Sequence, residues 1–195
     1  MIDWQIPIVL SGTRVELRPL ESNHQEELLM AASDGELWDL WYTSVPSEKT
    51  VTRYVETALM ELREQRSLPF IVVHKETGKI IGSTRYCHID EPNKRLEIGY
   101  TWYAKSYQRT GVNTECKYLL LKQAFEQYQT IAVEFKTNWF NFKSREAILR
   151  LGAKQEGVLR NHRINSDGSF RDSVVFSIIQ SEWGSVRRSL EHKMK

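Results

Sequence analysis

The chain has few of the features that mark secreted, membrane-spanning or metal-binding proteins. Its 195 residues include two cysteines, Cys87 and Cys116, whose spacing matches no metal-ligand motif such as C-x-x-C. Residues 1–10 lack the basic start and the long apolar stretch of a secretory signal. No apolar run approaches the roughly 20 residues that span a bilayer. We therefore expect a cytoplasmic protein with reduced cysteines, no metal and no membrane partner.

An excess of charge of one sign is also lacking. The chain carries 27 Lys and Arg against 25 Asp and Glu, a formal net charge of +2. This charge is too small to favour nucleic acid as a partner. No internal repeat and no linker rich in Pro, Gly or Ser divides the sequence. With 41% hydrophobic residues and this length, we expect one domain over residues 1–195.

The periods of the apolar residues predict a mixture of helices and strands. Helices are expected at 24–32, 51–62, 114–128, 142–151 and 182–190. Strands are expected at 15–18, 69–74, 80–86, 95–103, 131–137, 155–160 and 171–179. This order mixes hairpins with β-α-β crossovers. It predicts an α+β (mixed α/β) fold, in which helices flank a mixed central sheet.

One strand–loop–helix segment suggests a phosphate site. The predicted strand 95–103 leads into a loop that ends at Gly111 and opens a helix. The first turn of a helix has unpaired N–H groups and a positive dipole end, which together favour an anion. Gly111 would let the backbone approach a ligand closely, and Arg109 adds positive charge. An ordinary structural turn explains the same spacing, so both interpretations stay open.

The loop residues resemble a known signature. Gln108-x-x-Gly111-x-Asn113 resembles the Q/R-x-x-G-x-G/A motif of GNAT acetyltransferases, whose backbone N–H groups hold the pyrophosphate of coenzyme A. One departure is Asn113, which stands where the family prefers Gly or Ala. Its side chain must point away from the pyrophosphate or contact it. The resemblance extends over roughly residues 12–183.

Three other segments resemble the ribosomal-protein alanine acetyltransferase (RimJ/RimL-like) branch of this family. They are Arg14–Leu20, Glu97–Tyr100 and Asn141-x-x-Ser144 with the Leu151-Gly152-Ala153 that follows. The resemblance implies a GNAT fold with a twisted sheet, and acetyl-CoA as co-substrate without a metal. The residues that it places at the cofactor are Trp102, Tyr103, Gln108, Arg109, Thr110, Gly111, Val112, Asn113, Thr114 and Asn141.

Acetyl transfer to an amine requires a neutral amine and a stabilised leaving thiolate. By resemblance, Glu97 lies beside the acetyl group and is the candidate general base, acting through a water. The alternative is a structural glutamate that pairs with Arg95 or Arg85. Ser144 is the candidate hydrogen-bond donor and proton relay to the sulfur. Its alternative role is to cap a helix, because Ser and Asn satisfy free N–H groups in first turns.

Three aromatic residues lie between the first two predicted helices: Trp38, Trp41 and Tyr42. In this superfamily the region shapes the acceptor site, so they are candidates for a cleft wall. Plain core packing is the alternative. The branch suggests a protein N-terminal amine as acceptor, such as that of a ribosomal protein, and a homodimer. A small-molecule amine (amino acid, polyamine or antibiotic) is an alternative acceptor, and a non-catalytic acyl-CoA-binding regulator is an alternative function.

Overall fold

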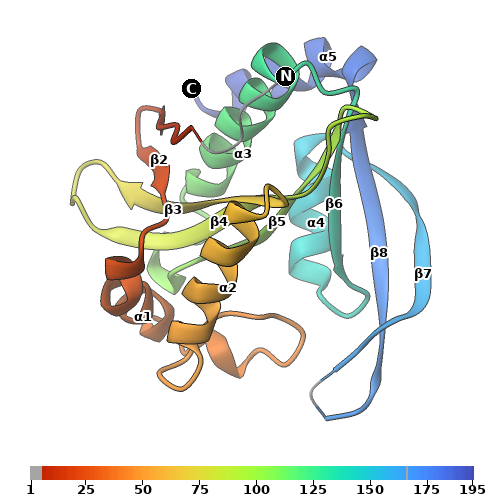
Figure 1. Cartoon of the computed structure of the whole chain (residues 1–195). Coiled ribbons are helices and arrows are strands. Elements are labelled where there is room, and N and C mark those ends of the chain that lie inside the picture. The colour runs from red at the N-terminus through yellow and green to blue at the C-terminus, as the bar shows by residue number, and fades with distance from the viewer. Residues whose placement is uncertain (1–5, 166) are drawn as a thin grey trace.

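The computed structural model describes residues 6–165 and 167–195, whose strands form one eight-stranded sheet (Figure 1). The strands lie in the order β1-β2-β3-β4-β5-β6-β8-β7. They are β1 (Leu10–Ser11), β2 (Val15–Pro19), β3 (Ser67–His74), β4 (Ile80–Asp90), β5 (Arg95–Tyr103), β6 (Ala132–Asn138), β7 (Lys154–Ile164) and β8 (Phe170–Ile179). The α-helices are α1 (Gln25–Ser33), α2 (Val51–Arg63), α3 (Val112–Lys122), α4 (Phe142–Leu151) and α5 (Gln180–Lys193). The mixed α/β class predicted from the sequence is confirmed.

The elements agree closely with the apolar periods of the sequence. The helix predicted over 114–128 begins at Val112 and passes into a π-helical turn, Gln123–Gln127. Strand β1 has only Leu10 and Ser11, too short for a period to show. Among the described residues, no helix combines the length and hydropathy that crossing a bilayer requires.

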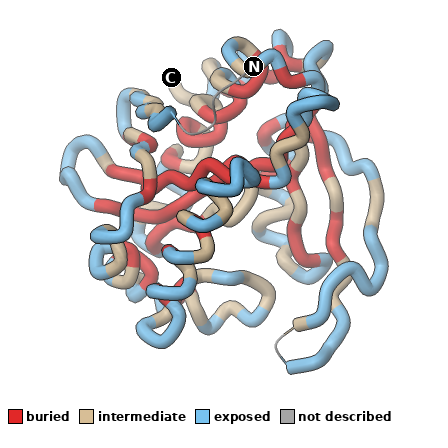
Figure 2. The backbone as a smooth tube through the Cα atoms, viewed as in Figure 1, coloured by how far each residue is buried: buried red, intermediate tan, exposed pale blue. Residues whose placement is uncertain are grey.

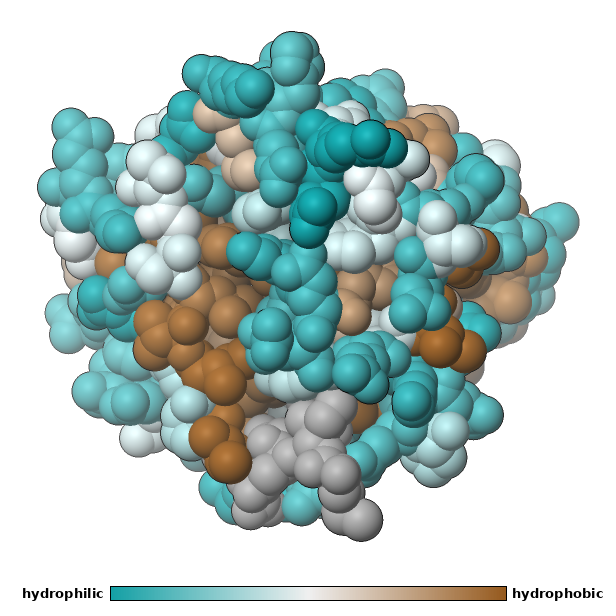
Figure 3. All heavy atoms as spheres, turned by 90° about the horizontal axis from the view of Figure 1, so that it is seen from above, coloured by the Kyte–Doolittle hydropathy of each residue, from teal (hydrophilic) through white to brown (hydrophobic). Residues whose placement is uncertain are grey.

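Helices cover both faces of the sheet and divide the core in two. One cluster packs β2–β6 and β8 against α3, α4 and α5, and includes Leu96, Ile98 and Phe135. The other packs β3–β5 against α1 and α2, and includes Trp102. The central strands are accordingly buried along most of their length (Figure 2). On the side of α3 and α5, hydrophilic atoms dominate the surface and hydrophobic atoms gather in separate areas (Figure 3).

A β-bulge interrupts β5 at its centre. Arg85 of β4 lies opposite Gly99, whereas Ser83 lies opposite Trp102, so β5 has one residue more than β4 between these pairs. Tyr100 takes a positive φ of 51° within the bulge. Such an extra residue bends the strand and re-aims its side chains. As a result β5 turns away from its other neighbour, β6.

The sheet opens between β5 and β6. Among the described strands these two form the single parallel pair, with Arg95 opposite Ala132, Leu96 opposite Val133 and Glu97 opposite Glu134. Beyond these pairs β5 follows β4 while β6 follows β8, and the two halves of the sheet diverge (Figure 1). We call the place where β5 leaves β6, after Glu97 and Glu134, the seam. It leaves one edge of β5 free of a strand neighbour in the centre of the molecule.

Candidate active site

The loop predicted to bind phosphate connects β5 to α3. Gly111 caps the helix with a φ of +89°, a conformation that favours glycine. Gln108 donates from Nε2 to the carbonyl of Tyr103 at 3.0 Å, and the Thr110 hydroxyl donates to the carbonyl of Tyr107 at 2.7 Å. These two side chains therefore shape the loop itself. Any ligand there would be held mainly by backbone N–H groups.

The first turn of α3 offers those N–H groups. The helical hydrogen bonds begin at the Glu115 N–H, which donates to the Gly111 carbonyl at 3.1 Å. The N–H groups of Val112, Asn113 and Thr114 precede this bond, as at any helix start. The Val112 side chain is buried in the core, which anchors the turn, while Asn113 and Thr114 are half-buried. The turn is thus rigid, and its polar groups face outward.

Arg14 adds a positive group from outside the Gln108–Asn113 motif. Its guanidinium lies about 3.9 Å from where a Cβ on Gly111 would be. Arg14 is held there by Glu115, whose buried carboxylate accepts the backbone N–H groups of Thr13, Arg14 and Val15 at 2.8, 2.8 and 2.9 Å. The start of β2 is therefore tied to the start of α3. No spacing in the sequence signals this contact across about one hundred residues.

Glu97 lies at the start of the seam and is 6% exposed. Its Oε2 is 3.0 Å from Nδ1 of His88 and 3.0 Å from Nζ of Lys136. Burial alone raises the pKa of this carboxyl, but the hydrogen bond from His88 and the charge of Lys136 outweigh burial and hold the pKa below its ordinary value. Glu97 is therefore a carboxylate at neutral pH.

Neither Arg95 nor Arg85, the ion-pair partners considered for Glu97 from the sequence, pairs with it. Arg95 pairs instead with Glu134, and Arg85 pairs with Glu61 at 3.3 Å. The reason is topological: β5 and β6 are neighbours in the sheet, so Lys136 of β6 reaches Glu97 on the same face. A salt bridge and a role as base are compatible, because the carboxylate keeps its charge and its second oxygen.

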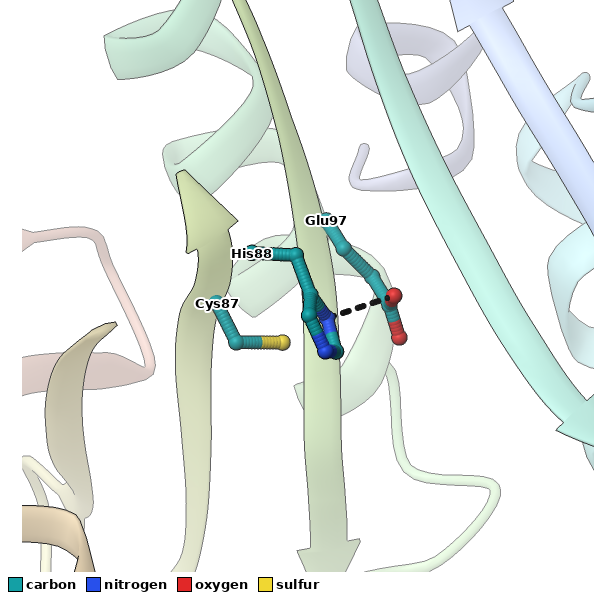
Figure 4. A group of neighbouring side chains, drawn as sticks. All are labelled: Cys87, His88 and Glu97. Carbon is teal, nitrogen blue, oxygen red and sulfur yellow. Dashed lines mark hydrogen bonds and ion pairs between the residues drawn. The ribbon is translucent and has the colours of Figure 1, made fainter. Parts of the chain in front are cut away.

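A second bulge, in β4, brings the side chains of His88 and Cys87 close to Glu97. His88 has a φ of +49°, where β4 shifts register against β5. Figure 4 shows both side chains turned toward Glu97, with one ligand-type atom of each within 4.8 Å of the others. Burial raises the pKa of the Cys87 thiol far above its ordinary value, so the thiol stays protonated. The Glu97 oxygen in this group already contacts both His88 and the Lys136 ammonium, which opposes metal binding here.

On the α2 side of β4 and β5, a buried arginine supports a small pocket. The guanidinium of Arg85 lies between the rings of Tyr54 and Tyr100, 4.7 and 4.3 Å from their centroids. Beside it is a pocket of about 150 Å³, whose lining includes Glu61, His88 and Tyr100. Because His88 contacts Glu97, this pocket lies directly next to the candidate base.

Asn141 and Ser144 lie across the seam, at the start of α4. Asn141 caps the helix: its Oδ1 accepts the backbone N–H of Ser144 at 3.1 Å. This confirms the capping role that first-turn residues commonly have. The Ser144 hydroxyl has no hydrogen-bond partner among the described residues and can serve a ligand.

The three aromatic candidates for the acceptor wall separate in the structure. Trp38 packs against the buried cluster of α1 and α2. Trp41 is 62% exposed and contacts Tyr42 and Phe140, with ring centroids 5.5 and 5.7 Å apart. Phe140, which is 57% exposed, lies between β6 and α4 and was not identified from the sequence. We call Trp41, Tyr42 and Phe140 the aromatic rim, which joins the α1–α2 connection to the far side of the seam.

Trp102 and Tyr103 end β5 beyond the bulge. Their side chains are buried in the two core clusters, with Trp102 on the α2 side and Tyr103 on the α3 side. Trp102 also donates from Nε1 to the Tyr54 hydroxyl at 3.2 Å. Contact with a ligand in the seam would therefore come from their backbone groups.

Comparison with known proteins supports the family resemblance. Residues 14–154 match the family model described as the acetyltransferase (GNAT) domain. Bacillus licheniformis N-acetyltransferase p20, an uncharacterized protein, is 25% identical over 87% of this chain and 95% of its own length. A GCN5-related N-acetyltransferase from Brucella melitensis superposes with a TM-score of 0.85 at 25% identity, covering 96% of this chain and 86% of the other.

A further structure shows the fold with a coenzyme A compound. It is Mycobacterium smegmatis RimJ in complex with CoA-disulfide, with a TM-score of 0.77 at 21% identity. The match covers 96% of this chain and 92% of that chain. At this identity the likeness concerns the fold, including the arrangement of its strands and helices.

Proposed function

Since the chain belongs to the GNAT family of acetyltransferases, we propose that it transfers the acetyl group of acetyl-CoA to the N-terminal amine of a polypeptide. The observation that carries the proposal is the seam. The helix start at Gly111, the buried Glu97 carboxylate and the Ser144 hydroxyl border this opening of the sheet and support acetyl transfer there. The aromatic rim favours a polypeptide as the acceptor.

The described residues fit coenzyme A. Gly111 gives the backbone the left-handed conformation that the loop needs, and the first-turn N–H groups suit a pyrophosphate. Arg14 and Arg109 add positive charge, because both belong to this loop or lie against it. The free edge of β5 at Trp102 and Tyr103 suits the amides of the pantetheine arm, which would continue the sheet. Asn141 borders the same opening from α4.

The chemistry follows from the groups at the seam. Bound acetyl-CoA supplies an activated acetyl group. Glu97, ionised and held by His88 and Lys136, takes a proton from the acceptor amine through a water. The amine nitrogen forms a bond with the carbonyl carbon as the carbon–sulfur bond breaks. The Ser144 hydroxyl donates a hydrogen bond to the departing sulfur.

The shape of the acceptor side favours a polypeptide. The pocket beside Glu97 measures about 150 Å³, below the roughly 300–1,000 Å³ of sites that enclose a drug-sized ligand. This volume suits the amine end of an acceptor, whose remaining part would lie outside. Exposed aromatic side chains such as Trp41 and Phe140 are typical of surfaces that bind peptides. The resemblance to the RimJ/RimL-like branch points to the same acceptor.

A panel of acceptors tests the proposal by release of free thiol from acetyl-CoA. It contains peptides with free N-termini, the same peptides with blocked N-termini, and small amines of the three alternative classes. We expect turnover of the free peptides. Trp41→Ala and Phe140→Ala should raise the peptide KM about tenfold, as loss of an aromatic anchor does, while Leu159→Ala, also on the surface, should not. Turnover of small amines alone would reject a polypeptide acceptor.

A further inference from the structure

Lys117 is a buried lysine on α3 that the mechanism above does not use. It is 5% exposed, although lysine is rarely buried without a partner. Its Nζ donates to the hydroxyl of Thr101 at 2.5 Å, and the Thr101 hydroxyl lies 2.7 Å from that of Thr84. The amine therefore points at β5 and its bulge, away from solvent.

This amine lies at the base of the seam, between β5 and β6. Thr101 lies on β5, beyond the last residue paired with β6, Glu97. On the other side, Phe135 of β6 directly follows the last paired residue, and its ring centroid is 6.0 Å from Nζ of Lys117. The Lys117 amine thus contacts one strand and faces the ring of the other where they part.

No acidic side chain among the described residues lies within ion-pair distance of Lys117. The groups that face it are the hydroxyls of Thr101 and Thr84, the ring of Phe135, and the thiols of Cys116 and Cys87. Burial raises the pKa of both thiols, so neither supplies a negative charge. A lone buried ammonium is destabilising, and an apolar residue would fill the same space without that penalty.

We propose that Lys117 is a catalytic residue: its amine contacts the sulfur of coenzyme A in the seam and protonates it as the acetyl group leaves. This inference rests on the proposed function. The carbon–nitrogen bond of the product forms, and the carbon–sulfur bond breaks with its electron pair on sulfur. The Lys117 ammonium gives that sulfur its proton, while Glu97 holds the proton lost by the acceptor amine. Transfer from Glu97 to Lys117 through solvent restores both groups.

The acidity of Lys117 suits this task. Burial lowers its pKa to about 7. An ordinary thiol has a pKa of about 8.5, so proton transfer from Lys117 to the sulfur is favourable. The Ser144 hydroxyl is too weak an acid to protonate a thiolate, although it can donate a hydrogen bond. The two groups therefore have different roles.

The test measures the pKa of the coenzyme A thiol in the complex, through the ultraviolet absorbance of the thiolate. Near pH 6.5, where most of the Lys117 amine still carries its charge, we expect the wild-type protein to lower the apparent thiol pKa by about one unit, because that charge lies next to the sulfur. Lys117→Met should abolish this shift. It should also reduce kcat about a hundredfold, as loss of a proton donor does. Lys122→Met is the matched control, since Lys122 is exposed on the same helix.

Thermal unfolding distinguishes catalysis from packing. Lys117→Met removes a lone buried amine, so its Tm should equal or exceed that of the wild type. Lys117→Gln, which keeps a donor for Thr101, provides a second variant with the same expected loss of the thiol shift. An unchanged thiol pKa in Lys117→Met, or unfolding of both variants, would overturn the proposal. Failure of the wild type to bind acetyl-CoA would instead reject the proposed function.

Discussion

Replacing Glu115 by Gln tests the contact that ties β2 to α3. Its Oε1 accepts the N–H of Thr13, and its Oε2 accepts those of Arg14 and Val15. An amide has one oxygen, so an NH₂ group must face at least one of these donors. The NH₂ group is best tolerated at the part-buried N–H of Thr13, so the substitution removes one charged hydrogen bond, worth about 1.5–3 kcal/mol. We expect a loss of about 2–3 kcal/mol in the free energy of unfolding.

Urea and thermal unfolding, followed by circular dichroism, measure this loss. For a domain of this size each kcal/mol lowers the Tm by roughly 2–4 °C, so Glu115→Gln should lower it by roughly 4–12 °C. Glu146→Gln is the control, because the Glu146 side chain is 71% exposed on α4 and should change stability by less than about 0.5 kcal/mol. A loss below about 1 kcal/mol for Glu115→Gln would refute the reasoning.

Two further substitutions address the loop and the base. Gly111→Ala and Gly78→Ala should each cost about 1–2 kcal/mol, because both glycines have a positive φ. Gly111→Ala alone should weaken acetyl-CoA binding tenfold or more by isothermal titration; equal affinity in the two variants would argue against the loop as the pyrophosphate site. Glu97→Gln should lower kcat about 10²–10⁴-fold, whereas Glu134→Gln, which also removes a partner of Lys136, should have a small effect; similar losses in both would point to the ion-pair network instead. Because folding lowers the pKa of Glu97, its ionised form stabilises the protein above the unfolded pKa, and this contribution disappears as the pH falls through the folded pKa. Below a pH of about 4.5, the free energy of unfolding of Glu97→Gln should therefore vary less with pH than that of the wild type. An equal pH dependence in the two proteins would contradict the lowered pKa of Glu97.

The sequence did not distinguish the two tryptophans of the irregular connection between α1 and α2. Trp38 and Trp41 lie three positions apart in a connection without a helical or strand period. Nothing local distinguishes the half-buried ring of Trp38 from the exposed ring of Trp41, because their burial depends on how the connection lies on α1 and α2. For Lys117 the local structure was predictable but the burial of the side chain was not. It falls within a regular helix, yet composition suggests a solvated lysine and the structure buries it under the seam.

The sequence by itself determined the α-helices, the longer strands, their order and the glycine turn before α3. These follow from local rules: the apolar period of α2, the turn at Gly111 and the cap at Asn141 each depend on residues a few positions apart. The tertiary structure alone decided which distant groups meet. Lys136 reaches Glu97 because β6 lies beside β5, and Phe140 reaches Trp41 across the same seam. Strand order and the point where β5 leaves β6 arise from packing of the whole sheet, which no local period encodes.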